Sequence, residues 1–368
     1  MNIDIKKKYK EDNKLLILEI LRFISAFSVL IWHYQLFFFV GAKPFNLEVA
    51  NLPLYSFLQP FYNFGLYGVI VFWGISGFIF FWKYGDIIST NRFDAKKFFI
   101  YRFSRLYPLH FLTLILVAIL QYFYLLKFDD YFVYKVNDLF HFFLHIFFAS
   151  NWGFERDYSF NGPIWSVSAE IFSYIIFFYS LKKFGKSFFI NFLIITFCVI
   201  LRILKLSNPI TDCLTTFFVC GSAALIYKLL SSYSFKKKIY YIILLISVVI
   251  PLIVVKFDLY KIKHFTYIFE FFYIPLILFL SANGFKFLDK FRHFIECVGN
   301  TTYASYLLHF PTQLFLCLIC SVFEIKIDFY DNFFFATYLL IIYSMSYFTY
   351  SYFEKPIQIF IRKITIKH

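Results

Sequence analysis

The sequence has little charge and few turn-forming residues for its length. Charged residues make up 16% of the 368 residues, and there are 12 glycines and 10 prolines. Soluble globular domains carry about 25% charged residues, so an ordinary soluble enzyme is excluded. No low-complexity stretch or linker divides the chain. The six cysteines lie in or beside apolar segments and are typical of buried thiols, not of a disulfide framework.

Apolar and aromatic residues are abundant instead. Hydrophobic residues account for 61% of the chain and aromatic residues for 26%, and the mean hydropathy is +0.68. The apolar residues fall in blocks of about 17 to 25, the length of helix that spans a bilayer. The sequence therefore predicts an all-α, polytopic membrane helix bundle without a second domain.

Eleven apolar blocks can be recognised, and one of them differs from the rest. The block at 138–150 is half a span long and contains His141 and His145. If it does not cross the membrane, about ten spans remain, and both termini lie on the same side. The ten spans lie near 15–40, 62–82, 98–124, 164–181, 187–205, 211–230, 239–256, 265–282, 302–322 and 332–353.

The basic residues favour this count. With a cytoplasmic N-terminus and ten spans, most of the 36 Lys and Arg residues fall in cytoplasmic segments, as the positive-inside rule requires. We therefore expect a cytoplasmic segment at 1–14, a membrane domain at 15–353 and a cytoplasmic tail at 354–368, in the plasma (inner) membrane. The net charge of +14 is explained by topology, and nucleic acid is not an expected partner.

Ionisable residues inside the first block indicate function. Arg22 and His33 are eleven residues apart, which places them on one face of a helix and about 16 Å apart along its axis. Glu19 precedes Arg22 by three residues, a spacing that permits an ion pair. An interfacial ion pair and a core histidine would also explain the pattern. Because charge in a bilayer is costly, the alternative interpretation is that these residues are functional and line one path from the cytoplasmic side into the bundle.

Two further blocks carry charge at their ends. The third begins with YRFSRLYPLHFL, in which Arg102 and Arg105 lie one turn apart before Pro108. These arginines could anchor the span or clamp phosphate groups, and Arg22 would complete the cationic patch. The fifth begins with NGPIWSVSAEIFSY, with Asn161 as a helix cap and Glu170 two turns in, where it could partner an imidazole.

Six motifs in order resemble those of the acyltransferase-3 family of integral membrane O-acyltransferases, over about residues 15–358. They are LRFISAFSVLIWHY, YGVIVFWGISGF, YRFSRLYPLHF, IWSVSAEIFSY, TTYASYLLHFP and YFEKPIQ. The resemblance implies a ten-helix enzyme that transfers an acyl group, usually acetyl, from cytoplasmic acyl-CoA to a hydroxyl, usually on a cell-surface glycan or its lipid-linked precursor. A C-terminal esterase-like domain, which some members carry, is not expected here.

The resemblance also implies roles for residues. It makes His33 and Glu170 catalytic, and it assigns donor binding to Arg22, Arg102 and Arg105. Candidates for acceptor contacts or for support of the site are Tyr306, His309, Trp165 and Ser166. His33 could be a general base on the acceptor hydroxyl or could carry the acyl group itself.

Other partners are few. Acyl-CoA is expected as a substrate and no bound cofactor is expected. His141 and His145 have a helical i, i+4 spacing, but no carboxylate completes a metal site, so no metal is expected. The sequence does not determine the oligomeric state. A glycan transporter or flippase would also be a polytopic bundle with buried charge, but the chain lacks an internal repeat.

Overall fold

Helices form almost all of the structure, a computed structural model that describes residues 15–230, 237–257, 259–261, 265–282 and 286–365. The predicted all-α membrane bundle is confirmed. A short hairpin of β1 (Phe39–Val40) and β2 (Lys43–Pro44) interrupts it. The α-helices are α2 (Leu16–His33), α3 (Tyr55–Phe64), α4 (Leu66–Ser89), α5 (Ala95–Phe128), α6 (Leu139–Ile146), α7 (Trp165–Phe184), α8 (Phe188–Ile203), α9 (Pro209–Leu230), α10 (Lys237–Lys256), α11 (Phe265–Ile268), α12 (Ile274–Ser281), α13 (Arg292–Val322), α14 (Asn332–Thr349) and α15 (Lys355–Thr365).

Short 3-10 and π-helical turns lie at the ends of several of these helices or between them. Two π-helical turns, Phe269–Tyr273 and Tyr350–Glu354, join α11 to α12 and α14 to α15. The 3-10 turns are Tyr34–Phe38, Val49–Asn51, Gly162–Ile164, Leu259–Lys261 and Lys286–Phe291. The first of them ends α2 at His33, earlier than the apolar block suggested.

Seven of the described helical segments are long and apolar enough to cross a membrane: Leu16–Phe38, Leu66–Ser89, Ala95–Phe128, Gly162–Phe184, Pro209–Leu230, Phe287–Val322 and Asn332–Thr365. The segments Phe188–Ile203 and Phe265–Ser281 are apolar but shorter. Ten spans and cytoplasmic termini therefore stay predictions. Helix α6 has eight residues, about 12 Å of helix, and is too short to cross a hydrocarbon core of about 30 Å.

The expected start of the fifth apolar block, 164–181, is only partly correct. Helix α7 does follow Pro163, which lies in the 3-10 turn Gly162–Ile164. Asn161, however, does not cap the helix with its side chain. Its Nδ2 donates instead to the backbone oxygen of Leu307 at 3.0 Å, so this residue ties α7 to α13.

The centre of the bundle is the close contact of α4 and α9. A Cβ atom on Gly77 would lie 2.0 Å from the backbone oxygen of Phe217, so only a glycine allows the two backbones to approach this closely. Aromatic rings fill the space around the contact: Phe80 packs edge to face against Phe217, and Phe81 packs edge to face against Phe177. The same packing fixes the position of α7, whose Phe177 joins the cluster.

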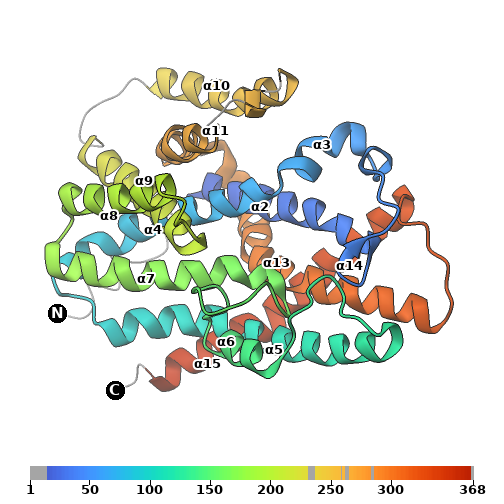
Figure 1. Ribbon diagram of the computed structural model, residues 1–368. Coiled ribbons are helices and arrows are strands. Elements are labelled where there is room, and N and C mark those ends of the chain that lie inside the picture. The colour runs from blue at the N-terminus through green and yellow to red at the C-terminus, as the bar shows by residue number, and fades with distance from the viewer. Residues whose placement is uncertain (1–14, 231–236, 258, 262–264, 283–285, 366–368) are drawn as a thin grey trace.

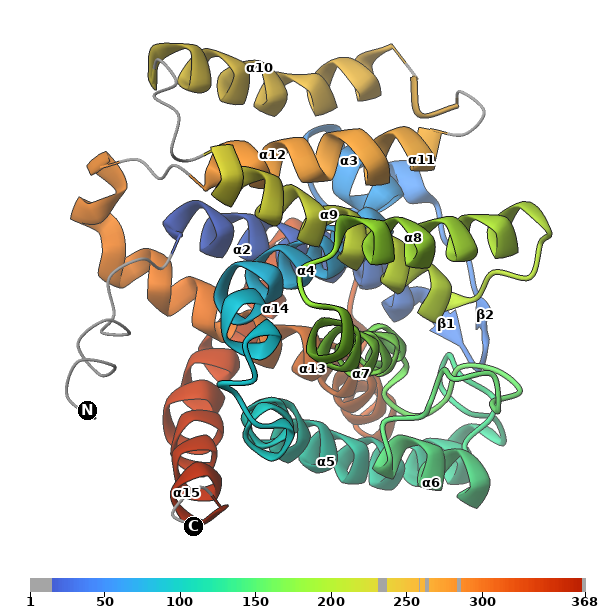
Figure 2. The same ribbon diagram turned by 90° about the vertical axis from the view of Figure 1, so that its left-hand side faces the viewer.

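The remaining helices are arranged around this centre. Figures 1 and 2 show α10 at one edge of the molecule, with the α11–α12 segment between α10 and the other helices. Helices α5 and α6 lie at the opposite edge, and α15 packs beside α5. Helices α2 and α13 pack together in the interior. Four interior helices (α2, α4, α7 and α13) and α5 thus surround a common space.

We predict that Gly77→Ala destabilises the protein, because the added methyl forces α4 and α9 apart. Overpacking of a tight contact costs about 1–3 kcal/mol. The matched control is Gly85→Ala on the same helix, where a Cβ would meet the Lys186 side chain at an ordinary 3.7 Å. Thermal unfolding of the purified variants in detergent should show a lower midpoint for Gly77→Ala only. Equal midpoints would contradict the tight contact.

We predict that the loop between α5 and α7 is extracytoplasmic and that the start of α10 is cytoplasmic, because this orientation keeps most basic residues inside. Single cysteines in a cysteine-free background can test this with a membrane-impermeant maleimide applied to intact cells. Asp157→Cys should be labelled and Lys237→Cys should not. The reverse labelling pattern would rule out the ten-span topology.

Candidate active site

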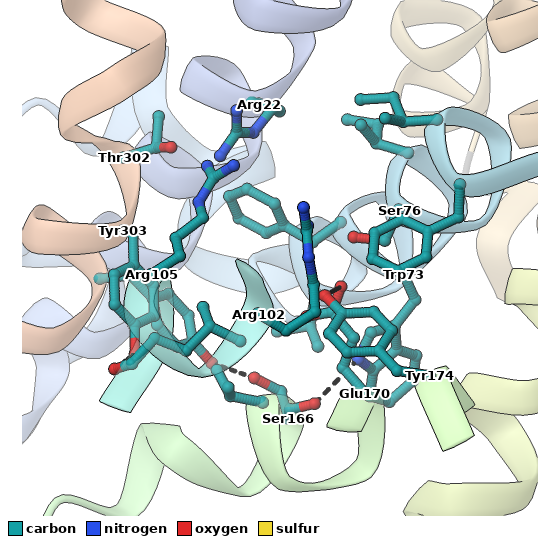
Figure 3. A pocket seen from close by; sticks show the side chains of 18 residues that line it. Arg22, Trp73, Ser76, Arg102, Arg105, Ser166, Glu170, Tyr174, Thr302 and Tyr303 are labelled. Atoms are coloured by element: carbon teal, nitrogen blue, oxygen red, sulfur yellow. Dashed lines mark hydrogen bonds between the residues drawn. The ribbon is translucent and has the colours of Figure 1, made fainter. Parts of the chain in front are cut away.

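One cavity is enclosed by α2, α4, α5, α7 and α13 (Figure 3). Its polar lining comes from every one of these helices and includes Arg22, Ser76, Arg102, Arg105, Ser166, Glu170, Tyr174, Thr302, Tyr303 and Tyr306. The sequence predicted that the three arginines lie at one depth, and the structure places all of them on this cavity. Charged groups are expensive inside a bilayer, so such a concentration marks a candidate site.

Arg22 is held by a carboxylate from its own helix. Its Nη1 donates to Glu19 Oε2 at 3.0 Å, which is the ion pair expected from the i, i+3 spacing. Glu19 in turn occupies space above Gly299 on α13, where a Cβ would lie 2.3 Å from Oε2. Gly299 therefore lets α13 pack against the ion pair, and Glu19 is 8% exposed there.

Arg102 and Arg105 differ in how they are held. The Arg102 guanidinium lies over the rings of Phe80 and Tyr84, and its Nη2 donates to Tyr84 Oη at 3.0 Å. Arg105 makes no hydrogen bond with another described residue. Figure 3 shows its guanidinium beside that of Arg22, and the two like charges act on each other. The side-by-side cations with unused N–H groups are suited to an anionic ligand.

Glu170 lies among the arginines and not beside His33, so the expected carboxylate–imidazole pair is wrong. Its Oε1 accepts a hydrogen bond from Tyr174 Oη at 2.6 Å, and its charge acts on Arg105. Depth along the helix suggested the pairing, but depth does not tell which way a helix face points. Tyr174 is one helical turn after Glu170 in the sequence, so this spacing could have predicted it.

His33 is paired with another histidine. Its Nδ1 lies 3.0 Å from His309 Nε2, and the two rings stack with centroids 4.9 Å apart. His309 Nδ1 lies 3.3 Å from the backbone oxygen of Ser305, which can only accept, so we assign the proton to His309 Nδ1. His309 Nε2 then accepts from His33 Nδ1–H. This tautomer leaves the lone pair of His33 on Nε2.

Tyr306 connects the cavity to the histidine pair. Its Oη lies on the cavity, donates to the backbone oxygen of Pro163 at 2.8 Å and lies 2.7 Å from Ser166 Oγ. Its ring contacts the His309 ring at 5.9 Å between centroids. Trp165 does not line the cavity; it packs edge to face against Trp73, whose Nε1 donates to the backbone oxygen of Ser166. Trp165 thus supports the start of α7.

His141 and His145 belong to α6, in the segment between α5 and α7, and do not line this cavity. His141 hydrogen-bonds Asp138 through its backbone N–H and its ring, and these bonds lower the pKa of Asp138. His145 Nε2 lies 3.0 Å from Ser159 Oγ. Both histidines are buried and fasten the loop between α5 and α7 to α6.

The fold and the cavity together define a membrane helix bundle with a buried, arginine-lined site and a histidine pair beside it. Comparison with protein families identifies the class. The model described as an acyltransferase domain, that of the acyltransferase-3 family, matches residues 15–316, and the chain belongs to this family. It is therefore a membrane acyltransferase. Comparisons with curated proteins and with solved structures gave no significant match. Helices α14 and α15 lie beyond the matched residues.

Proposed function

We propose that the protein transfers an acetyl group from cytoplasmic acetyl-CoA to a hydroxyl group of a cell-surface polysaccharide or of its lipid-linked precursor, in the inner membrane. The observation that carries the proposal is the cavity itself. Its lining includes three arginines and also Tyr306, whose ring contacts His309, the partner of His33. Family membership supports acyl transfer to oxygen.

The arginines form the donor end of the site. Acyl-CoA has a phosphate-bearing head and a long uncharged arm that ends in the thioester. Guanidinium groups bind phosphate oxygens in pairs of hydrogen bonds, and Arg105 has its N–H groups available for this. Arg22 lies about 16 Å before His33 along α2. The head can therefore stay at the arginines while the thioester is presented deeper in the bundle.

His33 supplies the base. Its Nε2 lone pair removes the proton from the acceptor hydroxyl as that oxygen attacks the thioester carbonyl carbon. The carbon–sulfur bond then breaks, and the imidazolium returns the proton to the departing CoA sulfur. His309 holds the ring in the required tautomer through the Nδ1 contact. The lone pair on Nε2 supports the general-base role that we propose, whereas an acyl-carrier role would need a second transfer step from the same nitrogen.

Glu170 has a positioning role in this scheme. It balances part of the cationic charge of the cavity and is fixed by Tyr174. Glu170 thereby keeps the arginines separate and correctly placed before the donor enters. The acceptor hydroxyl is expected to approach through Tyr306 and Ser166, which line the cavity, are hydrogen-bonded to each other and lie next to the histidine pair through the Tyr306–His309 contact.

The proposal is tested by reconstituting the purified protein in vesicles with radiolabelled acetyl-CoA and a polysaccharide acceptor. We expect label to appear on the acceptor as an alkali-labile ester, with one CoA released for each ester formed. Movement of glycan across the vesicle membrane without acetyl transfer would instead identify a transporter. Replacing acetyl-CoA by longer acyl-CoA donors tests the choice of acyl group.

We predict that His33→Ala reduces acetyl transfer by a factor of about 10² to 10⁴, the usual contribution of a general base. CoA binding should be preserved because His33 is remote from the arginines. The matched control is His293→Ala, since His293 is exposed at the start of α13. The measurement is single-turnover transfer beside CoA binding. Wild-type rates from the His33 variant would refute the assignment.

We predict that Arg105→Ala raises the apparent KM for acetyl-CoA about tenfold to hundredfold, because hydrogen bonds to charged groups contribute about 1.5–3 kcal/mol. The apparent KM of Arg105→Lys should lie between those of wild type and Arg105→Ala, since lysine keeps the charge but not the planar guanidinium with its paired N–H donors. Arg92→Ala serves as control because Arg92 is an exposed arginine before α5. The loss should grow weaker at high salt. An unchanged KM in Arg105→Ala would remove this residue from the donor site.

A further inference from the structure

Glu354 is a buried carboxylate with no assigned role. It is the last residue of the π-helical turn Tyr350–Glu354 between α14 and α15, and it lies beyond the residues matched by the family model. The side chain is 4% exposed, and its Oε2 is buried without a hydrogen-bond partner among the described residues. A buried carboxylate normally has such partners, so this group needs an explanation.

Glu354 lies outside the cavity, and its charge acts on arginines that line the cavity. Its turn packs against α5 and α13. Its charge acts on Arg105 of α5 and on Arg22 of α2, although neither arginine forms an ion pair with it in the described part of the chain. Its charge also acts on Tyr303 of α13 and on Tyr350 in the same turn. Glu19, the carboxylate partner of Arg22, and Glu170 are the other carboxylates whose charges act on Arg105. Glu354 does not itself line the cavity, so a ligand there would meet Arg105 first.

The backbone turn contributes to this position. A π-helical turn adds a residue to the helix and changes the direction of the side chains that follow, and such turns are frequent at functional sites. Here the turn ends at Glu354, and the helix then continues as α15 beside α5. Phe353 packs into the main aromatic core and anchors the turn.

Physical chemistry links this carboxylate to an anion on the arginines. Without hydrogen-bond donors, the ionised form of a buried carboxylate is costly unless cations lie close by. Arg105 and Arg22 supply that charge while the cavity is empty. When an anion binds these arginines, its negative charge repels that of Glu354 and offsets the stabilisation that the arginines give to the ionised carboxylate. The protonated form of Glu354 then becomes the favourable one.

We propose that Glu354 takes up a proton when a polyphosphate donor binds Arg105 and Arg22, so that donor binding is coupled to protonation at the C-terminal turn. This deepens the proposed function, because acetyl-CoA is the donor named there. No covalent bond changes in the step. One proton passes from solvent to the Glu354 carboxylate as the anion enters, and it returns to solvent as CoA leaves.

The sign of the pH dependence follows. The protein with CoA bound holds one more proton than the protein with an empty site. The affinity for CoA therefore falls as pH rises, over the pH range in which Glu354 is ionised in the empty protein and protonated in the complex. A one-proton linkage limits this fall to about tenfold per pH unit. Glu354→Gln imitates the protonated carboxyl group, so it should bind CoA at least as tightly as wild type and with less dependence on pH.

The experiment measures CoA binding by titration calorimetry, with the full chain in lipid nanodiscs and buffers of different ionisation enthalpy. The dependence of the heat on the buffer gives the protons taken up per CoA. Titration of the CoA phosphates is common to all variants and cancels in the difference. Glu354→Gln should take up fewer protons than wild type, by up to about one. The control is Glu296→Gln, a carboxylate paired with Arg292 on α13, which should match wild type.

Three results would overturn the proposal. Glu354→Gln could keep the full proton uptake, or it could weaken CoA binding as Arg105→Ala does, which would make Glu354 a structural support for Arg105. The Glu354→Asp variant keeps a carboxyl group that can titrate, so loss of proton uptake on CoA binding in a folded Glu354→Asp protein would also contradict the proposal. Repeating the titration with pyrophosphate separates this proposal from the proposed function. If pyrophosphate binds and CoA does not, acetyl-CoA is not the donor. The number of protons taken up by Glu354 can then still be measured with pyrophosphate.

Discussion

The structure depends on how three arginines are kept charged inside a membrane protein. Each has a separate means of support: Glu19 pairs with Arg22, aromatic rings and Tyr84 hold Arg102, and the charges of Glu170 and Glu354 face Arg105. These supports come from different helices, so the helices must pack in one arrangement for the site to exist. The glycines at 77 and 299 permit that packing.

The same constraint separates the two ends of the site. The charged end is polar and partly open to a ligand, whereas the histidine end is a compact set of neutral hydrogen bonds among residues of α2 and α13. Gln313 extends this set, donating from Nε2 to the backbone oxygen of His33. The arginines line the cavity, and the histidine pair with its fixed tautomer lies next to it, in contact with Tyr306.

Much of this could be predicted from sequence because membrane segments and their flanking charges are local features. The bundle and the gathering of the three arginines follow from apolar block length and helical periodicity, whereas the end of α2 at His33 does not. The partner of His33 could not be predicted, because it is set by the rotation of α13 against α2, which lie 276 positions apart at the contact. The motif YFEKPIQ contains Glu354, but its burial could not be predicted, because it arises at a π-helical turn that no spacing rule indicates.

Helix α5 has a consequence for how the protein sits in lipid. Its 34 residues extend for about 51 Å, well beyond a hydrocarbon thickness of about 30 Å. Arg105 lies about 15 Å from the start of that helix. Bilayers of different thickness can be matched by tilting α5 or by exposing its ends to headgroups, while Arg105 stays fixed to the helices that pack around it. Hydrophobic mismatch should then alter the lipid around the enzyme more than the depth of its cation site within the protein.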